Sequence, residues 1–588
     1  MDSFVLDVDG ESRAERAIAT GGGTARGDRG VEIAATDLWQ TVKGGRNVLH
    51  GVSLTVKACE LVAVVGGSGA GKTTLLEALA GVRPAERGHV HYDGVDLYEN
   101  FDSFRRMLGY VPQDDIIHAE LPLRRTLRYA AALRLPESRS SADIDAAVDR
   151  SLAALDLSER ADVQVGALSG GQRKRASIAV ELLTSPPVFF LDEPTSGLDP
   201  ASSSELLRLL RGLADGGSTV VFTTHSVQDL ARADRVVFLA REGHLAFAGT
   251  VAEALEYFGV ERIEEIYERL ATEETPEQWA RRFESYRLNG QAVAPPIPAE
   301  PPEPPKSRDG IGFAREWAVL TRRTLETLAR NRLTLAILLG SPALVVAMFA
   351  VLFRPGAFEF ADPNPSAITM ILFWVTFGAF FFGLTYGLLQ VVTERAILHR
   401  EQLVGQRISA YLGSKMAVLL PFLVFVVVLM LAVLRALDRL PAADMTTYLT
   451  IGVTLVLLAA SALTLGLMTS AAVSNPAQAT LALPMLCFPA VLFSGAILPV
   501  HEMAGAGAAL SNIIQDRWAF EALGHDLGIR HILADGGSPL GPPLVAAYGK
   551  DAGTEPTVVY WSYLATFTVA FFFGAWGILR RKGRRTTR

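Results

Sequence analysis

Three short stretches in the first half of the chain carry residue types that bind and hydrolyse a phosphate anhydride. "GGSGAGKT", from Gly66 to Thr73, has the spacing G-x-x-x-x-G-K-[ST], in which backbone N–H groups surround a phosphate and a lysine neutralises its oxygens. "LDEP" contributes an acidic pair, Asp192 and Glu193, suited to Mg²⁺ coordination and to activation of water. His225 ends the run "TVVFTTH", where it can reach a terminal phosphate. Together these stretches predict hydrolysis of a nucleoside triphosphate.

A fourth stretch, "LSGGQRKR", begins at Leu168 and offers a second grip for an anion. Two glycines after a serine expose backbone N–H groups, and a following helix would add its positive end. The chain already has one phosphate loop for a bound nucleotide. A second anion-binding motif in the same chain, which we call the second grip, therefore calls for a different role. The nucleotide-contacting residues predicted so far are Gly66, Gly67, Ser68, Gly69, Ala70, Gly71, Lys72, Thr73 and Thr74 in the loop, and Leu168, Ser169, Gly170, Gly171 and Gln172 in the second grip.

The elements around these motifs are those of an α/β domain. "LVAVVGG" is an apolar, β-branched run typical of a buried strand, and "KTTLLEALAG" reads as a helix that ends at glycine. Strand and helix patterns alternate in this way over residues 31–287. Residues 1–30 are polar and glycine-rich and predict a disordered lead. Residues 288–310 include "APPIPAEPPEPP", whose prolines predict a semi-rigid linker.

The second half of the chain predicts an all-α membrane domain over residues 333–580. An amphipathic helix at residues 311–332 precedes it, with arginines between apolar positions as on a helix at the cytoplasmic membrane face. Six apolar segments have about the 20 residues that cross a bilayer. They are Leu333 to Phe353, Ile368 to Val392, Tyr411 to Leu434, Leu449 to Ala472, Ala477 to Val500 and Val558 to Leu579.

Basic residues set the expected orientation of these spans. "TERAILHREQLVGQR" after the second span and "RRKGRR" after the sixth, which runs into the basic tail at residues 581–588, are rich in arginine, which the positive-inside rule places in the cytoplasm. Both termini are then cytoplasmic, and the loop at residues 501–557 faces outward. The acidic start "MDSFVLDVDG" argues against a cleaved signal peptide. A net charge of -7 gives no basis for a nucleic-acid partner, and two cysteines in different halves give none for a disulfide framework.

The five motifs together resemble the nucleotide-binding domain of the ABC transporter superfamily. The phosphate loop, "LSGGQ", the "LDEP" segment, "SGLD" and His225 occur in the family's order. The resemblance implies ATP and Mg²⁺ as ligands, with Glu193 as general base, His225 as switch histidine and Gln113 in the Q-loop. It also implies Mg²⁺ contacts from Thr73, Gln113 and Asp192, and a D-loop role for Asp199. In the family, "LSGGQ" of one subunit closes over the ATP of the other, which explains the second grip and predicts a dimer.

A second layer of motifs resembles the G-subfamily, or white-type, half-transporters. The soluble domain precedes the membrane domain, and "GGQRKRASIAVELL", "TERAILHRE" and "RWAFEAL" match the subfamily pattern. Departures occur where an adenine-stacking aromatic is common, since Val42 stands there with Trp39 three residues earlier, and at Cys59, where the family usually has glycine. The outer loop has no cysteine, so covalent dimer links there are excluded and a bacterial plasma-membrane protein fits better than a eukaryotic one.

The resemblance implies that the second and fifth spans line a substrate cavity. Its expected residues are Phe373, Phe377, Phe380, Phe381, Met485 and Phe488; the alternative is that these side chains only pack helices or face lipid. No charged residue falls well inside the six spans, which disfavours ion or proton pumping and favours export of a lipid-like or amphipathic organic substrate. For coupling, Asp114 or Asp115 is expected to meet Arg395 or Arg400, unless these arginines only follow the positive-inside rule.

Two other functions remain open from the sequence. A mechanochemical ATPase that acts on a membrane partner without transport would carry the same nucleotide motifs, and an importer is disfavoured only by domain order and by the resemblance. Neither the substrate nor the choice between a homodimer, which we favour, and a heterodimer with another half-transporter follows from the sequence.

Overall fold

The computed structural model describes residues 30–42, 44–289, 311–549 and 553–586. The chain divides into two compact units. The first comprises Met1–Val319 with His399–Gln406 and Gly583–Arg588, and the second comprises Leu320–Leu398 with Arg407–Lys582. The predicted lead (residues 1–30) falls outside the described residues except for its last residue, and the predicted linker (288–310) except for its first two.

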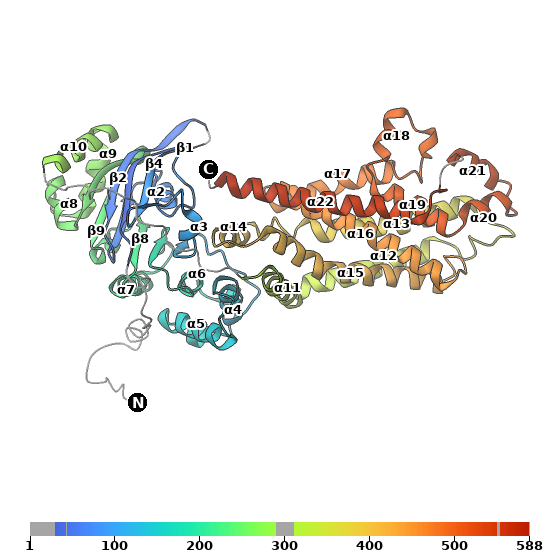
Figure 1. The fold of residues 1–588 in the computed structure, drawn as a ribbon, viewed down its shortest axis with the longest axis horizontal. Coiled ribbons are helices and arrows are strands. Elements are labelled where there is room, and N and C mark those ends of the chain that lie inside the picture. The colour runs from blue at the N-terminus through green and yellow to red at the C-terminus, as the bar shows by residue number, and fades with distance from the viewer. Residues whose placement is uncertain (1–29, 43, 290–310, 550–552, 587–588) are drawn as a thin grey trace. The chain divides into compact units, whose positions relative to one another are not determined.

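The first unit contains two sheets, whose strands run side by side in Figure 1. One sheet has six strands in the order β10 (His244–Gly249), β9 (Arg235–Ala240), β3 (Leu61–Gly66), β8 (Thr219–Thr224), β7 (Val188–Leu191) and β6 (Leu108–Val111). The other has four, in the order β2 (Arg46–Val56), β1 (Ile33–Val42), β4 (Arg87–Tyr92) and β5 (Val95–Asp96). Strands β9, β3, β8, β7 and β6 are parallel, and β10 is antiparallel to β9.

The central strands are apolar because both faces of the parallel sheet are covered. Every residue of β3, β7 and β8 is buried, as expected for strands with helices on both sides. The helices of this unit are α2 (Lys72–Leu79), α3 (Phe101–Phe104), α4 (Leu123–Arg134), α5 (Ser141–Ala154), α6 (Gly170–Leu182), α7 (Pro200–Asp215), α8 (Val251–Phe258), α9 (Ile263–Thr272) and α10 (Pro276–Asn289). The α/β fold expected from the sequence is therefore present.

The second unit consists of helices in the part of the chain that is described. They are α12 (Arg332–Leu352), α13 (Pro365–Leu388), α15 (Ile408–Ala436), α16 (Met445–Ala472), α17 (Pro476–Leu492), α18 (Gly505–Ser511), α19 (Gln515–Asp526), α20 (Ile529–Asp535) and α21 (Gly541–Tyr548). The remaining three, α11 (Phe313–Arg330), α14 (Arg395–Leu403) and α22 (Thr557–Thr586), continue across a unit boundary. Five helices are long and apolar enough to cross a membrane: α12, α13, α15, α16 and α22.

The predicted fifth span is shorter than expected. Its helix, α17, has 17 residues and ends at Leu492, rather than continuing to Val500. Two prolines inside it, Pro484 and Pro489, remove backbone donors, and its length is at the lower limit for a transmembrane helix.

Small residues bring two of the long helices into close contact. A Cβ added at Gly383 would lie 2.3 Å from the backbone oxygen of Ala459, and one at Gly387 would lie 2.4 Å from that of Leu463. From the other side, Gly466 approaches the backbone oxygen of Leu384. Helix association in lipid depends on such close packing, so α13 and α16 form a closely packed pair.

Candidate functional site

The nucleotide motifs meet because they follow neighbouring parallel strands. Residue pairing aligns Val65 of β3 with Thr224 of β8 and Leu191 of β7 with both Phe222 of β8 and Val111 of β6. The carboxyl ends of these four strands therefore lie along one edge of the sheet, which is where open α/β sheets bind ligands.

The phosphate loop connects β3 to α2 and has the backbone shape that its glycines allow. Gly69 and Gly71 have φ values of 76° and 89°, in the left-handed region. The Lys72 ammonium donates to the carbonyl oxygens of Gly66 and Gly67 at 3.0 and 3.3 Å. A Cβ at Gly67 or Gly69 would meet open space, so the glycines leave room for a phosphate against the backbone. Ser68, Ala70, Thr73 and Thr74 complete the loop and the first turn of α2.

Glu193 lies at the centre of the polar groups at this edge. Its carboxylate is 3.9 Å from the Lys72 ammonium and 3.5 Å from Nδ1 of His225, and it accepts a hydrogen bond from the Gln113 amide at 3.3 Å. The backbone of Glu193 has a φ of 44°, a left-handed conformation that costs energy for a residue with a side chain. Three residues from three sequence-distant motifs, Lys72, Gln113 and His225, thus converge on the carboxylate of a fourth motif.

Threonine hydroxyls fix the acidic pair and the histidine loop. The Thr223 hydroxyl donates to Asp192 Oδ1 at 2.6 Å and accepts from the Glu193 N–H at 2.8 Å. A buried aspartate, Asp229, accepts hydrogen bonds from Thr195 and Thr224, both at 2.6 Å. Because Thr195 follows Glu193 and Thr224 precedes His225, Asp229 holds the two loops together. No motif in the sequence points to Asp229.

Lys174 is a second residue that the motifs did not reveal. It lies on α6, and its ammonium donates to the carbonyl oxygen of Gln113 at 2.6 Å and approaches Asp115 at 3.8 Å. Burial lowers the pKa of Lys174 and raises the pKa of Asp115. The backbone of the Q-loop is therefore attached to the helix that begins at "LSGGQ". The sequence signal for Lys174 is its position in "GGQRKR", which directly continues the "LSGGQ" motif.

The "LSGGQ" residues lie at the start of α6. Leu168 is buried, and Ser169 caps the helix, accepting from the N–H of Gln172 at 3.3 Å while Gln172 accepts from the N–H of Ser169 at 3.1 Å. A Cβ at Gly170 would meet open space, and one at Gly171 would touch Leu198 at 3.5 Å. Asp199 caps α7 in a similar way, accepting from Ala201 and Ser202 at 3.0 Å.

The two departures from the family pattern have local explanations. Cys59 adopts a φ of 63°, the left-handed region that favours glycine, in the turn before β3. Trp39 is engaged by neighbours in its own unit: its indole N–H donates to Asp37 at 2.7 Å, and its ring meets the His50 ring edge-on at 5.5 Å. Neither observation supplies an aromatic platform for a base.

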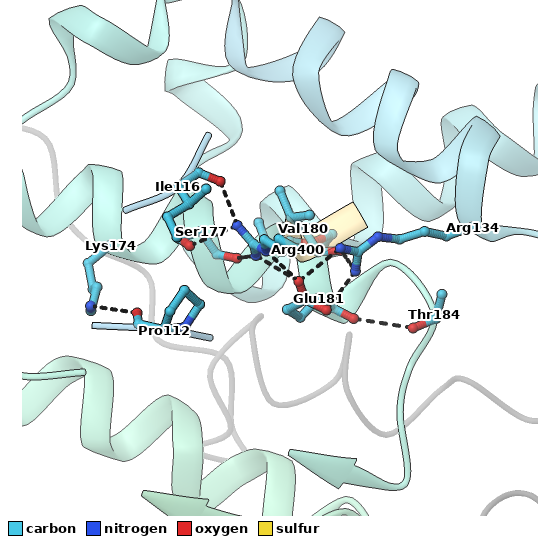
Figure 2. A network of polar contacts seen from close by, with 11 residues as sticks. Pro112, Ile116, Arg134, Lys174, Ser177, Val180, Glu181, Thr184 and Arg400 are labelled. Atoms are coloured by element: carbon cyan, nitrogen blue, oxygen red, sulfur yellow. Dashed lines mark hydrogen bonds and ion pairs between the residues drawn. The ribbon is translucent and has the colours of Figure 1, made fainter. Parts of the chain in front are cut away.

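Arg400 forms a buried network around Glu181 (Figure 2). Its Nε donates to Glu181 of α6 at 2.8 Å, and its Nη groups donate to the carbonyl oxygens of Ile116 and Ser177 at 2.9 and 2.8 Å. Glu181 also accepts two bonds from Arg134 of α4, at 2.6 and 2.9 Å. Of the expected contacts between Asp114 or Asp115 and Arg395 or Arg400, Asp115 interacts electrostatically with Arg400. The acid that Arg400 bonds directly is Glu181, inside the apolar run "IAVELL".

The charged groups of this network are shielded from solvent and neutralise one another. The side chains of Arg134, Glu181 and Arg400 are 5%, 3% and 6% exposed. Burial would raise the pKa of Glu181, but the two guanidinium groups hold it below its usual value. Glu401, next in the chain, adds a second negative charge near both arginines.

The aromatic residues expected to line a cavity lie in different environments. Phe373 and Phe380 are buried within the second unit, Phe377 and Phe381 are half-buried, and Met485 and Phe488 of α17 are exposed. A cavity of about 600 Å³ in this unit is lined by other residues, among them Leu372, Phe520, His525 and Tyr548. The structure of the single chain therefore does not bring the six residues together.

Comparison with known proteins identifies the two parts of the chain. Residues 49–196 match the family model described as ABC transporter, and residues 315–524 match the one described as ABC-2 type transporter. The ABC transporter ATP-binding/permease protein Rv1747 of Mycobacterium tuberculosis is 34% identical over 495 residues, which are 82% of this chain and 56% of that protein.

Relatives of the G family match about a third of the chain. ABC transporter G family member 26 of Arabidopsis thaliana is 38% identical over 37% of this chain and 33% of its own length. The broad substrate specificity ATP-binding cassette transporter ABCG2 of Bos taurus is 37% identical over 34% of this chain and 31% of its own length. The chain thus spans about half of the mycobacterial relative and about a third of the other two. With an ATP-binding domain ahead of an ABC-2 type membrane domain, the chain belongs to the ABC transporter superfamily and has the arrangement of a G-subfamily-like half-transporter.

Proposed function

We propose that this chain is an ATP-hydrolysing half-transporter that works as a dimer and exports a lipid-like or amphipathic organic compound. The observation that carries the proposal is the position of Glu193, within 3.9 Å of Lys72 and 3.5 Å of His225 and bonded to Gln113. A carboxylate held beside a phosphate loop can accept the proton of a water molecule that attacks the terminal phosphate of ATP. In this role, Glu193 is the general base and His225 orients the reacting group.

The other loop residues bind and position the nucleotide. Lys72 now uses the carbonyl oxygens of Gly66 and Gly67 as acceptors, and phosphate oxygens would replace them. Backbone N–H groups from Gly66 to Thr74, at the N-terminus of α2, would then surround the phosphates. Positioning and charge neutralisation account for most of the rate enhancement in phosphoryl transfer.

Mg²⁺ fits the residues present at the edge of the sheet. The hydroxyl of Thr73, the amide of Gln113 and the carboxylate of Asp192 would hold it, and Asp192 is fixed by the Thr223 hydroxyl through one oxygen. Bound there, the ion would neutralise charge on the phosphates. In the described part of the chain, no group of three or more His, Cys, Asp or Glu side chains could hold a metal alone, so nucleotide oxygens would complete the site.

The second grip supports a dimeric active unit. Ser169 uses its hydroxyl oxygen as the helix cap, and no described residue accepts its proton. That O–H and the N–H groups of Gly170 and Gly171 would contact the terminal phosphate of ATP bound to the partner subunit. A homodimer satisfies this with a single gene product, and we favour it over a heterodimer.

Substitutions in this motif should separate nucleotide binding from hydrolysis. Ser169→Arg or Gly170→Asp is expected to abolish hydrolysis, at least about a hundredfold, because each places bulk or negative charge where the partner's phosphate would lie. Binding of ATP to the phosphate loop of the same chain should stay within a small factor of wild type, as measured with a fluorescent ATP analogue. Hydrolysis at the wild-type rate in both variants would contradict the shared site.

We propose the contact of Arg400 with Glu181 as the route by which the membrane domain and the nucleotide site influence each other. The segment His399–Gln406 lies between two predicted spans in the sequence but clusters with the first unit. Arg400 bonds to α6, which begins at the signature residues, and to Ile116, three residues after Gln113. A displacement of this segment would therefore act on both parts of the ATP site.

Arg400→Met should uncouple the two activities. Methionine keeps the apolar stem but removes the charge-assisted bonds, each contributing about 1.5 kcal/mol or more. We expect basal hydrolysis to persist while transport per ATP falls about tenfold, the factor for about 1.4 kcal/mol. Arg395→Met on the same helix is the matched control, since Arg395 bonds to Val473 and not to α6. Equal transport losses in both variants would refute the specific role of Arg400.

The membrane path remains a proposal built on two helices. Met485 and Phe488 of α17 are exposed in the single chain, so a dimer could place them, with the half-buried Phe377 and Phe381, around a central cavity together with Phe373 and Phe380. Apolar and aromatic side chains suit a lipid-like or amphipathic compound. Among the relatives, the bovine protein's printed name states broad substrate specificity, which agrees with this class without selecting a compound.

We place both termini and the first unit in the cytoplasm, with residues 501–557 outside. The chain is a multi-pass membrane protein, and arginines after α13 and in the C-terminal turns of α22 favour this orientation. It requires α17 to count as a sixth crossing. Similarity to a mycobacterial protein supports a bacterial plasma membrane. A mechanochemical ATPase without transport is the alternative, and movement of a solute by the purified protein distinguishes the two.

A further inference from the structure

Asp516, at the start of α19, is a fully buried acid in the second unit and has no hydrogen-bond partner for either carboxyl oxygen among the described residues. Two other charges of this unit that are largely buried are paired. Lys415 bonds to Glu394 at 2.7 Å, and Arg517, next to Asp516 in the chain, bonds to Glu521 at 2.9 Å. An ionised carboxylate without a partner is very costly in an apolar interior. Asp516 therefore needs another explanation than a structural ion pair.

The position of Asp516 along the membrane-spanning helices follows from its contact with α13. Its carboxyl faces Thr376, which is the twelfth residue of the 24 in α13, one of the five apolar helices long enough to span a membrane. Asp516 itself lies outside the predicted spans, so a count of charged residues within those spans missed it. An ionisable residue at this depth marks a functional site by default.

The hydrogen bonding of the Thr376 hydroxyl bears on whether the carboxyl of Asp516 is protonated. Thr376 is fully buried and donates its only hydroxyl proton to the carbonyl oxygen of Phe373 at 3.0 Å. While that proton is engaged by Phe373, Thr376 does not neutralise a charge on Asp516, and no cation among the described residues pairs with it. A neutral carboxylic acid also avoids the cost of a buried charge.

Few ionisable groups face Asp516 from the neighbouring elements. Helix α17 contributes Cys487, which interacts with Asp516 electrostatically. The ionisable residues of α13 and α16 are Tyr386 and Tyr448. The others on α19 and on α20, which follows it, are Arg517, Glu521, His525, Asp526, Arg530, His531 and Asp535. No lysine, arginine or histidine among the described residues pairs with Asp516.

We propose that Asp516 is a proton-binding site of the membrane domain, occupied while α19 packs on α13. When α19 separates from α13 and water reaches the carboxyl, the O–H bond breaks, the proton passes to water and a carboxylate remains. Closing the helices again requires a proton to return. The conformational cycle is then linked to pH, whatever compound the protein moves. This goes beyond the proposed export function and does not depend on it.

Infrared difference spectroscopy of the full-length protein in lipid tests the site directly. The probe is the proton itself, and the comparison is between wild type and Asp516→Asn, a neutral side chain of the same shape. At neutral pH we expect wild type to show the C=O stretch of a protonated carboxylic acid, and the variant to lose it. Glu502→Gln, which changes an exposed acid in the same unit, should leave this band unchanged. A wild-type spectrum with only carboxylate bands would overturn the proposal.

Thermal stability gives a second readout that does not need activity. If the folded state holds a proton on Asp516 that the unfolded state has released, stability must fall as pH rises from the ordinary aspartate pKa, 3.8, through the raised folded-state pKa of about 8, and level off above it. We expect the melting temperature of wild type to decline over this range and that of Asp516→Asn to decline less. Identical slopes for the two proteins would contradict proton binding. If the variant does not fold, wild-type protein with isotope-labelled aspartate still tests the proposal, because the label shifts the C=O band of a protonated aspartic acid.

Discussion

Glu193→Gln is expected to lower the rate of ATP hydrolysis by the purified protein by about a hundredfold or more, the usual contribution of a general base. Glutamine keeps the shape of the side chain and its contact with Gln113 but cannot accept a proton from water. ATP should still bind, because the phosphate loop and Lys72 are unchanged. Phosphate release and retention of labelled ATP on the same sample measure both effects.

Glu205→Gln is the control for this experiment. Glu205 lies on α7 in the same unit, is 41% exposed and pairs with Arg175 at 3.4 Å on the surface. Its hydrolysis rate should equal that of wild type. If Glu193→Gln also hydrolyses ATP at the wild-type rate, another group must activate the water and the assigned role of Glu193 is wrong.

Glu181→Ala is expected to destabilise the first unit by about 3–5 kcal/mol, the cost of leaving buried charges without their partner. The substitution removes the acceptor of two hydrogen bonds from Arg134 and one from Arg400. For a unit of this size, the loss corresponds to a decrease of roughly 10 °C in melting temperature. Thermal unfolding of the full-length protein in detergent measures it.

The matched control is Glu205→Ala, which breaks a partly exposed pair and should cost no more than about 1 kcal/mol. The folded-state pKa of Glu181 is below the ordinary 4.5. Its contribution is therefore complete above about pH 4.5 and is lost as pH falls through the folded-state pKa. Equal melting temperatures for Glu181→Ala and wild type at neutral pH would show that the network does not hold the unit together.

The nucleotide motifs could be predicted from sequence because each has a fixed local context. A glycine-rich turn between an apolar strand and a helix, or an acidic pair at a strand end, defines its own surroundings over about ten residues. The parallel sheet then brings Gly66, Gln113, Glu193 and His225 to one edge. Neither step depends on knowing distant contacts.

The supporting residues could not be predicted because their roles depend on tertiary contacts. Asp229, Lys174 and Glu181 are single acids or bases without a spacing rule, and each acts on a segment far away in the sequence. For this reason the direct bond of Arg400 to Glu181 was not foreseen, and the expected partner Asp115 interacts with Arg400 only electrostatically. The sequence shows acidic residues that could pair with Arg400. Which of them faces the arginine depends on how α6 packs.

Membrane helices show the same limit. Five spans were recognised because about 20 apolar residues are sufficient to identify a crossing. The length of α17 depends on where its helix ends, which hydropathy does not report. Asp516 was missed because α19 lies outside every apolar segment, although its carboxyl meets the middle of α13.

The most direct test of the central claim is ATP-dependent movement of an amphipathic probe by the purified protein in liposomes. A fluorescent phospholipid analogue serves as the probe, with the Glu193→Gln protein in matched liposomes. We predict that ATP drives net movement of the analogue by wild type and not by the variant. The contradicting result would be wild-type protein that hydrolyses ATP at its full rate but moves neither the analogue nor any lipid that copurifies with it. That result would favour a mechanochemical ATPase.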